Sequence, residues 1–269
     1  MGVDRGQAGG TEVAGAQEGG LMAGPQVAAP GTAGPTPSGW VKVDCHLHTV
    51  RSGDAVTTLD QLEERVEAIG LDVVCITDHH AVDAAIEALR LDLGARVVVG
   101  EEIRTPAGEI IGLFLTERIP YVLPADEVVA RIRAQGGLVY APHPYDGVRN
   151  SLRHALDGLC RQGSIDIIEA FNAKLKDDAH NRVASEVAAR YGIPIAAGSD
   201  AHDPPGVGAA WVEMPDFDGP VAFLDSLSAG RLVGEYRPHA PRFPGASPAR
   251  WEPSADDVTP PRAAPHRVR

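Results

Sequence analysis

Short apolar runs alternate with helical patterns along the middle of the chain. The runs are short and continuously apolar, which predicts buried β-strands. These expected strands cover residues 40–48, 71–80, 95–103, 108–115, 138–144, 165–173, 193–202 and 208–214. The patterns between several of them predict helices over residues 57–70, 81–94, 125–137, 178–192 and 219–230.

The first expected helix shows the signals most fully. A threonine or aspartate near residue 58 can cap its start, and Gly70 closes it. Leu62, Val66 and Ile69 lie on one face. Apolar strands alternating with such helices are typical of a parallel sheet that is covered on both faces or closed into a barrel. The six or seven strand–helix units favour a compact α/β barrel.

The two ends of the chain differ in composition from the middle. Residues 1–39 are rich in glycine, alanine, proline, threonine and glutamine, and residues 241–269 have the same character. Such segments bury too little apolar surface to offset their ordering entropy, so we expect both to be disordered. The folded domain is expected over residues 40–240.

Charge and cysteine content narrow the class of protein. A net charge of −13 argues against binding to extended nucleic acid or to a membrane surface, although a local positive site for a small anion remains possible. Three cysteines without a CxxC pair suit a reducing compartment. Without a signal peptide or a long apolar span in the sequence, we expect a cytoplasmic protein. The oligomeric state is left open.

Polar side chains gather where the expected strands end. In chain order they are His46 and His48, Asp78 and His79, Glu101 and Glu102, His143, Glu169 and Asn172, and Asp200 and His202. The carboxyl ends of barrel strands meet at one mouth, so these groups should lie close together. Imidazoles and carboxylates brought together in this way are typical of a divalent metal cluster.

The spacing of two histidine pairs supports a metal site. Side chains two residues apart on a strand point to the same side, so His46 and His48 can hold one ion, and Asp200 and His202 repeat the pattern. A single pair of this kind could be incidental. Its recurrence at several strand ends favours metal binding.

The motifs DCHLHTVRSGDA, ITDHH, VVVGEEI, APHP, IEAFN and AAGSDAH resemble, in order, those of the polymerase and histidinol phosphatase (PHP) superfamily of metal-dependent phosphoesterases. The resemblance extends from residue 43 to about residue 234. It implies a distorted (β/α)7 barrel that hydrolyses phosphate esters with two or three divalent ions, such as Mn, Zn, Mg or Fe, at its mouth.

The resemblance also implies roles for individual residues. His46, His48 and Asp200 would bind a first metal that shares the bridging Glu102, and Asp54, His79 and His202 would hold another. The acid at position 54 is shifted by one residue relative to some relatives. His143 would bind a remaining metal. Glu109 stands where many members have a further histidine, which favours a harder ion there or weak occupancy.

The resemblance implies hydrolysis by a hydroxide that the metal ions generate from water, acting on a small phosphorylated molecule such as a nucleotide. Candidate phosphate ligands near the mouth are Arg51, Arg104, Asn172 and Lys174, and each is equally compatible with a solvated loop residue. Two alternatives stay open. One is a metal-dependent amidohydrolase, which usually adds a strand-end lysine, and none is obvious here; the other is a catalytically silent PHP module.

Overall fold

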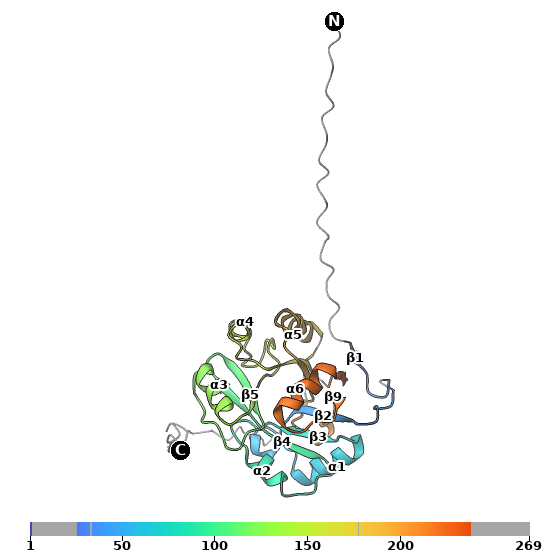
Figure 1. Cartoon of the computed structure of the whole chain (residues 1–269). Helices are drawn as coiled ribbons and strands as arrows, with labels where there is room; N and C mark the ends of the chain where they lie inside the picture. The colour runs from blue at the N-terminus through green and yellow to red at the C-terminus, as the bar shows by residue number, and fades with distance from the viewer. Residues whose placement is uncertain (2–25, 33, 177, 238–269) are drawn as a thin grey trace, which may run out of the picture.

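Ten strands form one strongly curved sheet in the computed structural model, which describes residues 1, 26–32, 34–176 and 178–237 (Figure 1). The order across the sheet is β1-β10-β9-β2-β3-β4-β5-β6-β7-β8. The strands are β1 (Val27–Ala28), β2 (Trp40–Leu47), β3 (Val73–Ile76), β4 (Arg96–Thr105), β5 (Gly108–Leu113), β6 (Leu138–Ala141), β7 (Ile167–Asn172), β8 (Ile195–Gly198), β9 (Ala210–Pro215) and β10 (Arg231–Gly234).

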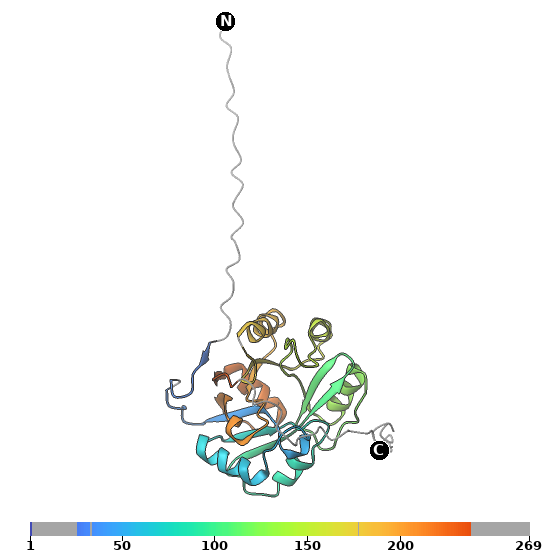
Figure 2. The same cartoon turned by 180° about the vertical axis from the view of Figure 1, so that it is seen from behind.

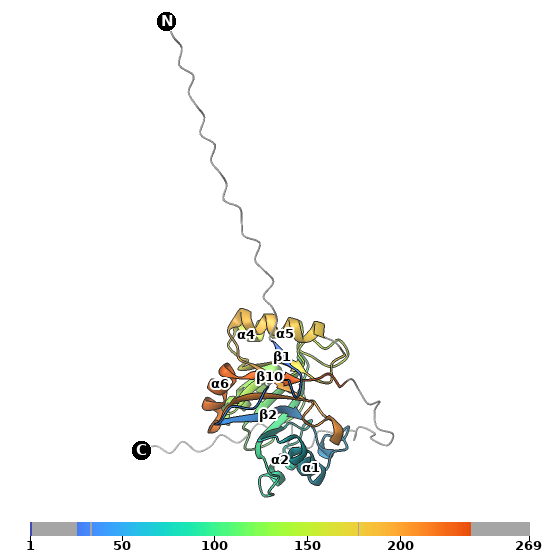
Figure 3. The ribbon, with the colours of Figure 1, turned by 90° about the vertical axis from the view of Figure 1, so that its right-hand side faces the viewer.

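Helices cover the outside of this sheet. Figures 2 and 3 show α4 and α5 on one side of the molecule and α1 and α2 on the opposite side. The helices of the described part are α1 (Leu59–Ile69), α2 (Asp83–Ala88), α3 (Ala125–Ala134), α4 (His154–Arg161), α5 (Asp178–Tyr191) and α6 (Gly219–Ala229), with short 3₁₀ turns η1 (Val50–Ser52) and η2 (Pro204–Gly206). In the described residues, no helix combines the length and apolar character needed to cross a bilayer.

Helix α1 begins and ends where the sequence predicts. The Thr58 hydroxyl accepts a hydrogen bond from the backbone N–H of Gln61, whose side chain accepts one from the N–H of Thr58. Gly70 ends the helix with a φ of 70°, a conformation that costs glycine little. Leu62 and Val66 are buried against the sheet, as their spacing predicts.

Seven strands, β2 to β8, curl into the distorted barrel expected from the sequence. An isolated bridge pairs Leu47 at the end of β2 with Ala201 just after β8. Two hydrogen bonds reinforce this closure: the N–H of His48 donates to the carbonyl of Ala201 at 3.0 Å, and the N–H of Asp200 donates to the carbonyl of His46 at 2.7 Å. Closure of the barrel therefore holds the two histidine-containing pairs side by side.

The expectation of a parallel sheet is wrong in part. Strand β5 runs antiparallel to both β4 and β6, and β9 runs antiparallel to β2 and β10. Only residues 106–107 separate β4 from β5, which is too short for the crossover that parallel strands need. Gly108 begins β5 with a φ of 138°, and its backbone packs directly against that of Leu152.

The folded structure begins earlier than residue 40. Strand β1 pairs in parallel with β10, so residues 27–28 belong to the sheet although they lie in the segment for which we expected disorder. Residues 2–25 and 241–269, for which disorder was also expected, lie outside the described residues. Strand β10 and helix α4 were not predicted from the sequence.

Candidate metal centre

His46 and His48, at the end of β2, lie at the centre of the polar cluster and are fully buried. Their Nε2 atoms are 3.1 Å apart. Glu102 Oε2 lies 3.4 Å from Nε2 of His46 and 3.3 Å from Nε2 of His48. Asp200 Oδ1 lies 3.9 and 3.5 Å from the same two nitrogens. The four side chains predicted to hold one metal therefore meet in one buried space.

Hydrogen bonds on the far side of each ring fix where its proton lies. Nδ1 of His46 donates to Glu169 Oε1 at 3.0 Å, since that carboxylate can only accept. Nδ1 of His48 is 2.9 Å from Oγ of Ser52, and this hydroxyl donates its own proton to Asp78. Both rings therefore carry hydrogen on Nδ1 and turn an Nε2 lone pair into the cluster. Outer partners of this kind orient metal-binding histidines.

His143, after β6, follows the same pattern. Its Nδ1 lies 3.3 Å from Oγ of Ser151, which donates to the His143 carbonyl and so accepts from the ring. Its Nε2 faces Glu102 Oε1 at 3.0 Å. The backbone φ angles of His143 and Asp200 are 26° and 50°, a region that non-glycine residues seldom adopt. Strained backbone of this kind is often found at functional sites.

Glu102 contacts four histidines of the cluster, one more than Asp200 does. Besides His46 and His48 it reaches Nδ1 of His79 at 3.3 Å and, through its other oxygen, His143. Burial raises the pKa of Glu102, but the imidazoles of His79, His46 and His143 outweigh it and hold the pKa well below its usual range. Glu101 points elsewhere and accepts from the N–H of Ile119 at 2.7 Å. The arrangement suits the bridging role predicted for Glu102.

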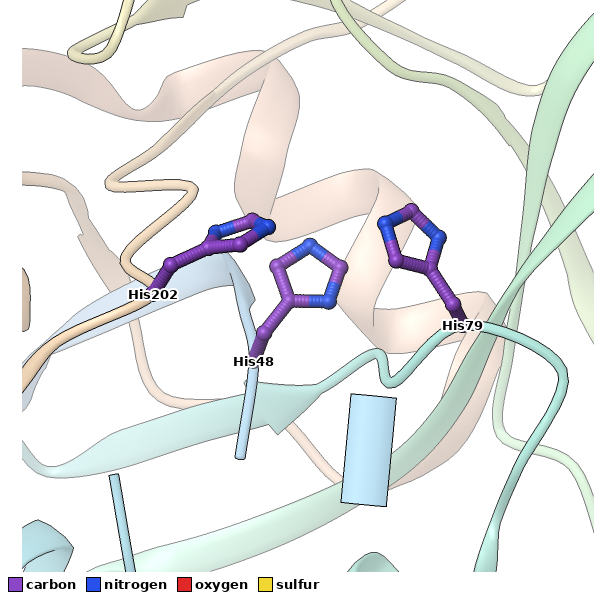
Figure 4. A group of neighbouring side chains, drawn as sticks. All are labelled: His48, His79 and His202. Carbon is purple, nitrogen blue, oxygen red and sulfur yellow. The ribbon is translucent and has the colours of Figure 1, made fainter. Parts of the chain in front are cut away.

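A second group lies beside the first and nearer the mouth. Figure 4 shows the rings of His79 and His202 on either side of His48. Asp54 Oδ2 is 3.5 Å from Nε2 of both His79 and His202. Burial lowers the pKa of His79 to about 3 and that of His202 to about 4, so both rings are neutral at physiological pH. Neutral imidazoles beside a carboxylate are suited to a divalent ion.

Glu109 lies near the cluster but has a competing partner. One of its oxygens lies within 4.8 Å of ligand atoms of His79 and Glu102. The same side chain accepts hydrogen bonds from Arg104 at 3.2 and 3.3 Å. Burial and the nearby Glu102 raise the pKa of Glu109. The structure thus places Glu109 at the edge of the site, and a role as a metal ligand stays a prediction.

The four candidate phosphate ligands divide into two kinds. Lys174 and Asn172 lie within the site: Lys174 Nζ is 3.6 Å from Asp200 Oδ1, and Asn172 donates to Asp200 Oδ2 at 3.0 Å. The Arg104 side chain is half-exposed and forms an ion pair with Glu109. Arg51 is exposed and forms an ion pair with the exposed Glu87 at 3.4 Å. The structure therefore favours a solvated loop residue over a phosphate ligand at this position.

Arg149 was missed by the sequence analysis. It lies in the loop between β6 and α4, where its Nε contacts Asp146 at 3.1 Å and its Nη1 forms an ion pair with Asp200 Oδ2. Burial raises the pKa of Asp200, but Arg149, Lys174 and His46 hold it well below its usual value. No strand or helix pattern marks a loop arginine, so its role was visible only once the chain was folded.

Asp44 is a buried carboxylate that links two chain segments of the site. Its fully buried carboxylate accepts from the backbone N–H groups of His46 at 3.3 Å, Ser199 at 3.0 Å and Gly208 at 3.2 Å. Burial raises its pKa to about 6 despite these bonds. Asp44 therefore ties the end of β2 to the segment that carries Asp200 and His202.

The donor set fits divalent metal ions. Within each of four sets of three residues the ligand atoms lie within 4.8 Å of one another. Together the sets involve eight residues: His46, His48, His79, Glu102, Glu109, His143, Asp200 and His202. The Nε2 lone pairs of His46 and His48 repel each other unless a proton or a cation lies between them. Mixed imidazole and carboxylate donors are compatible with Zn, Mn or Fe.

Family comparison places the chain among known proteins. The PHP domain model matches residues 44–191, and the model of the PHP-associated region matches residues 178–232. Two proteins of Methanocaldococcus jannaschii, both named as uncharacterized, are similar in sequence. MJ1587 is 37% identical over 156 residues, which is 54% of this chain and 89% of MJ1587. MJ0417 is 35% identical over 197 residues, which is 70% of this chain and 79% of MJ0417.

Solved structures share the fold. A two-domain protein from Bacteroides vulgatus, described as containing a predicted PHP-like metal-dependent phosphoesterase, has a TM-score of 0.55 and 20% identity over 74% of this chain and 63% of its own. This chain thus spans less than two thirds of that protein. An amidohydrolase from Chromobacterium violaceum has a TM-score of 0.51 and 16% identity over 71% of this chain and 97% of its own. Since the PHP domain model matches more than half of the sequence, the chain belongs to the PHP domain family.

Proposed function

We propose that this protein is a metal-dependent hydrolase of phosphate esters that acts on a small phosphorylated molecule. The observation that carries the proposal is the meeting of the His46 and His48 Nε2 lone pairs, 3.1 Å apart, with Glu102 and Asp200 in a buried space. Membership of the PHP family and the likeness to a predicted phosphoesterase support it.

The residues of the first position would hold one ion, and Asp54, His79 and His202 would hold another, with Glu102 between them. Divalent ions bound there supply Lewis-acid chemistry, because they acidify water and neutralise the charge on a phosphate. The buried His46, His48 and His143 keep their Nε2 atoms directed at this space through their Nδ1 hydrogen bonds. No serine or cysteine nucleophile is needed.

Positive side chains complete a site for an anionic substrate. Lys174 is partly buried beside Asp200 and His202, with Nζ 2.9 Å from Nδ1 of His202. A lysine ammonium and divalent ions together favour a dianionic phosphate over a neutral substrate. We therefore retain Lys174 as a substrate ligand, while Asn172 orients Asp200.

A metal-dependent amidohydrolase is the second candidate. The specific observation that favours it is Lys174 itself, which follows the end of β7 and lies within the cluster, although the sequence analysis found no obvious strand-end lysine. The fold likeness to the Chromobacterium violaceum amidohydrolase is compatible with this candidate. The close packing of the ligand-type residues argues against a catalytically silent module.

The test is a screen of phosphorylated metabolites, with monoesters, diesters and a matched set of amide substrates, in Mn²⁺, Mg²⁺ and Zn²⁺ in turn. We expect release of phosphate or of an alcohol from at least one ester with at least one ion. Hydrolysis of amides alone would favour the amidohydrolase. Absence of any hydrolysis together with absence of metal binding would favour the silent module.

A further inference from the structure

A cavity of about 490 Å³ lies outside the barrel, away from the metal centre. Its walls come from residues 30, 31 and 34–36, from β2, α1 and β9, and from the chain that follows β10. None of the proposed metal ligands lines it. Figure 3 shows β1 and β10 side by side, as their parallel pairing requires. A volume of this size is within the range of cavities that bind small molecules.

Three cations from three different elements line the cavity: Lys42 of β2, Arg65 of α1 and Arg237 after β10. Within the described part of the chain, none of them has a carboxylate close enough for an ion pair. Arg65 and Arg237 instead donate to the backbone carbonyls of Val207 and Pro205. In addition, Nε of Arg65 is buried without a hydrogen-bond partner in the described structure. A buried N–H of this kind costs free energy unless a ligand satisfies it.

The pairing register of β2, β9 and β10 explains why Lys42 forms no ion pair with Glu213. Lys42 lies opposite Glu213 across β2 and β9, and Arg231 lies opposite Glu213 on the other side. Glu213 pairs with Arg231 at 2.5 Å and also accepts from the hydroxyl of Thr36. The ammonium of Lys42 lies 5.6 Å above the ring of Trp211 instead.

The charge balance of the cavity is therefore positive. With Glu213 neutralised by Arg231, Glu235 is the remaining carboxylate in the wall, against Lys42, Arg65 and Arg237. The whole chain carries a net charge of −13, so a positive cavity is a local exception. Arginine forks match the geometry of phosphate oxygens, and lysine adds a point charge.

We propose that this cavity is a second ligand site, separate from the metal centre, that binds a small phosphorylated anion such as a nucleotide. The phosphate groups would contact Arg65, Arg237 and Lys42, and the remaining volume would hold the organic part. One wall, formed by Pro205, Val207 and Gly208, follows shortly after His202 in the chain. The proposal does not depend on the hydrolytic function.

The test is isothermal titration calorimetry of the full chain with ADP and with pyrophosphate, in the presence of a chelator so that no metal-bound substrate site contributes. We expect saturable binding of both probes that weakens with added salt. Arg65→Gln and Arg237→Gln should each weaken it at least about tenfold, the loss expected for one charge-assisted hydrogen bond. Lys42→Gln provides a third variant should either arginine variant unfold.

Two controls separate this site from the rest of the molecule. Arg90→Gln removes an exposed cation outside the cavity, and His48→Ala disrupts the metal centre; both should bind the probes as the wild type does. Failure of the wild type to bind either probe would overturn the proposal. So would equal affinity in the folded cavity variants, or loss of binding in His48→Ala alone.

Discussion

Nε2 of His46 lies 3.1 Å from Nε2 of His48, although the hydrogen on each neutral ring is held at Nδ1. Burial lowers the pKa of His48, but hydrogen bonds to Asp200 and Glu102 outweigh it and raise the pKa to about 9. The pKa of His46 is likewise raised well above its usual value, because Glu169, Asp200 and Glu102 outweigh the effect of burial. Without metal, the site holds a proton where a cation fits.

Metal affinity at this position should therefore depend on pH. A metal must displace a proton held with a pKa of about 9, so affinity should rise about tenfold per pH unit for each proton displaced as the pH increases toward 9. The ligands of the other position, His79 and His202, are already neutral above pH 4 and should show little such dependence. Calorimetry between pH 6 and 9 in two buffers, which reports the protons released, checks both statements.

The same shift affects the metal-free protein in the opposite direction. Because the folded pKa of His48 is raised from 6.5 to about 9, its contribution to the free energy of unfolding is fully present below pH 6.5 and is lost as the pH rises through 9. Chelated protein should therefore lose stability over this window, whereas metal-loaded protein should not. Equal urea midpoints for the two forms at each pH would contradict the assignment.

Arg149 should position Asp200 for the metal. Replacing it by alanine leaves Asn172 as the described hydrogen-bond donor to Asp200 Oδ2. We expect Arg149→Ala to weaken metal binding about 10- to 100-fold, as for other outer partners of metal ligands, with Arg149→Lys intermediate. Relief of repulsion between the guanidinium and the metal opposes this loss. The control Arg90→Gln should bind metal as the wild type does. If Arg149→Ala binds metal more tightly, repulsion between the guanidinium and the metal outweighs any positioning of Asp200.

Glu109→Ala should lower the number of metal ions bound per chain. The expected reason is that Glu109 takes the place of a histidine found in many family members and lies within 4.8 Å of His79 and Glu102 ligand atoms. Elemental analysis after dialysis measures the number of metal ions per chain. The matched control is Glu117→Ala, which removes an exposed carboxylate from the loop that follows β5. An unchanged metal count would leave Glu109 as the partner of Arg104 only.

Asp44 should make the folded state sensitive to pH between about 4 and 6. Its folded pKa of about 6 exceeds 3.8, so the folded state is favoured while Asp44 is protonated, and this advantage is lost as the pH rises through 6. The shift corresponds to about 3 kcal/mol. Asp44→Asn should remove this part of the pH dependence in urea unfolding of chelated protein. The exposed control is Asp60→Asn. If the free energy of unfolding depends on pH equally in Asp44→Asn and Asp60→Asn, Asp44 does not cause the effect.

Strand ends were the most predictable part of this molecule. Continuous apolar runs such as the one before His46 specify buried strands, and the polar residues that follow them are forced to the same mouth once the barrel closes. The sequence alone therefore predicts that seven side chains lie together: His46, His48, His79, Glu102, His143, Asp200 and His202. The distances within the cluster agree with that convergence.

Features that depend on pairing or on loops could not be predicted in the same way. The antiparallel course of β5 follows from the short turn before Gly108, which an apolar run does not reveal by itself. Strand β1 has two residues and exists only because β10 offers an edge. Arg149 lies in a loop whose path depends on the Asp146 and Asp200 carboxylates that it contacts.

Hydrolysis of p-nitrophenyl phosphate by the metal-loaded chain, with and without chelator, tests whether the metal centre hydrolyses phosphate esters. The variants measured alongside are His48→Ala, Asp200→Ala and the exposed control His154→Ala. We expect the wild type and His154→Ala to hydrolyse the ester, and we expect the chelator to abolish this activity and added metal to restore it. We expect no hydrolysis by folded His48→Ala or Asp200→Ala. Activity that survives the chelator, or that is retained in His48→Ala and Asp200→Ala, would contradict hydrolysis at the metal centre.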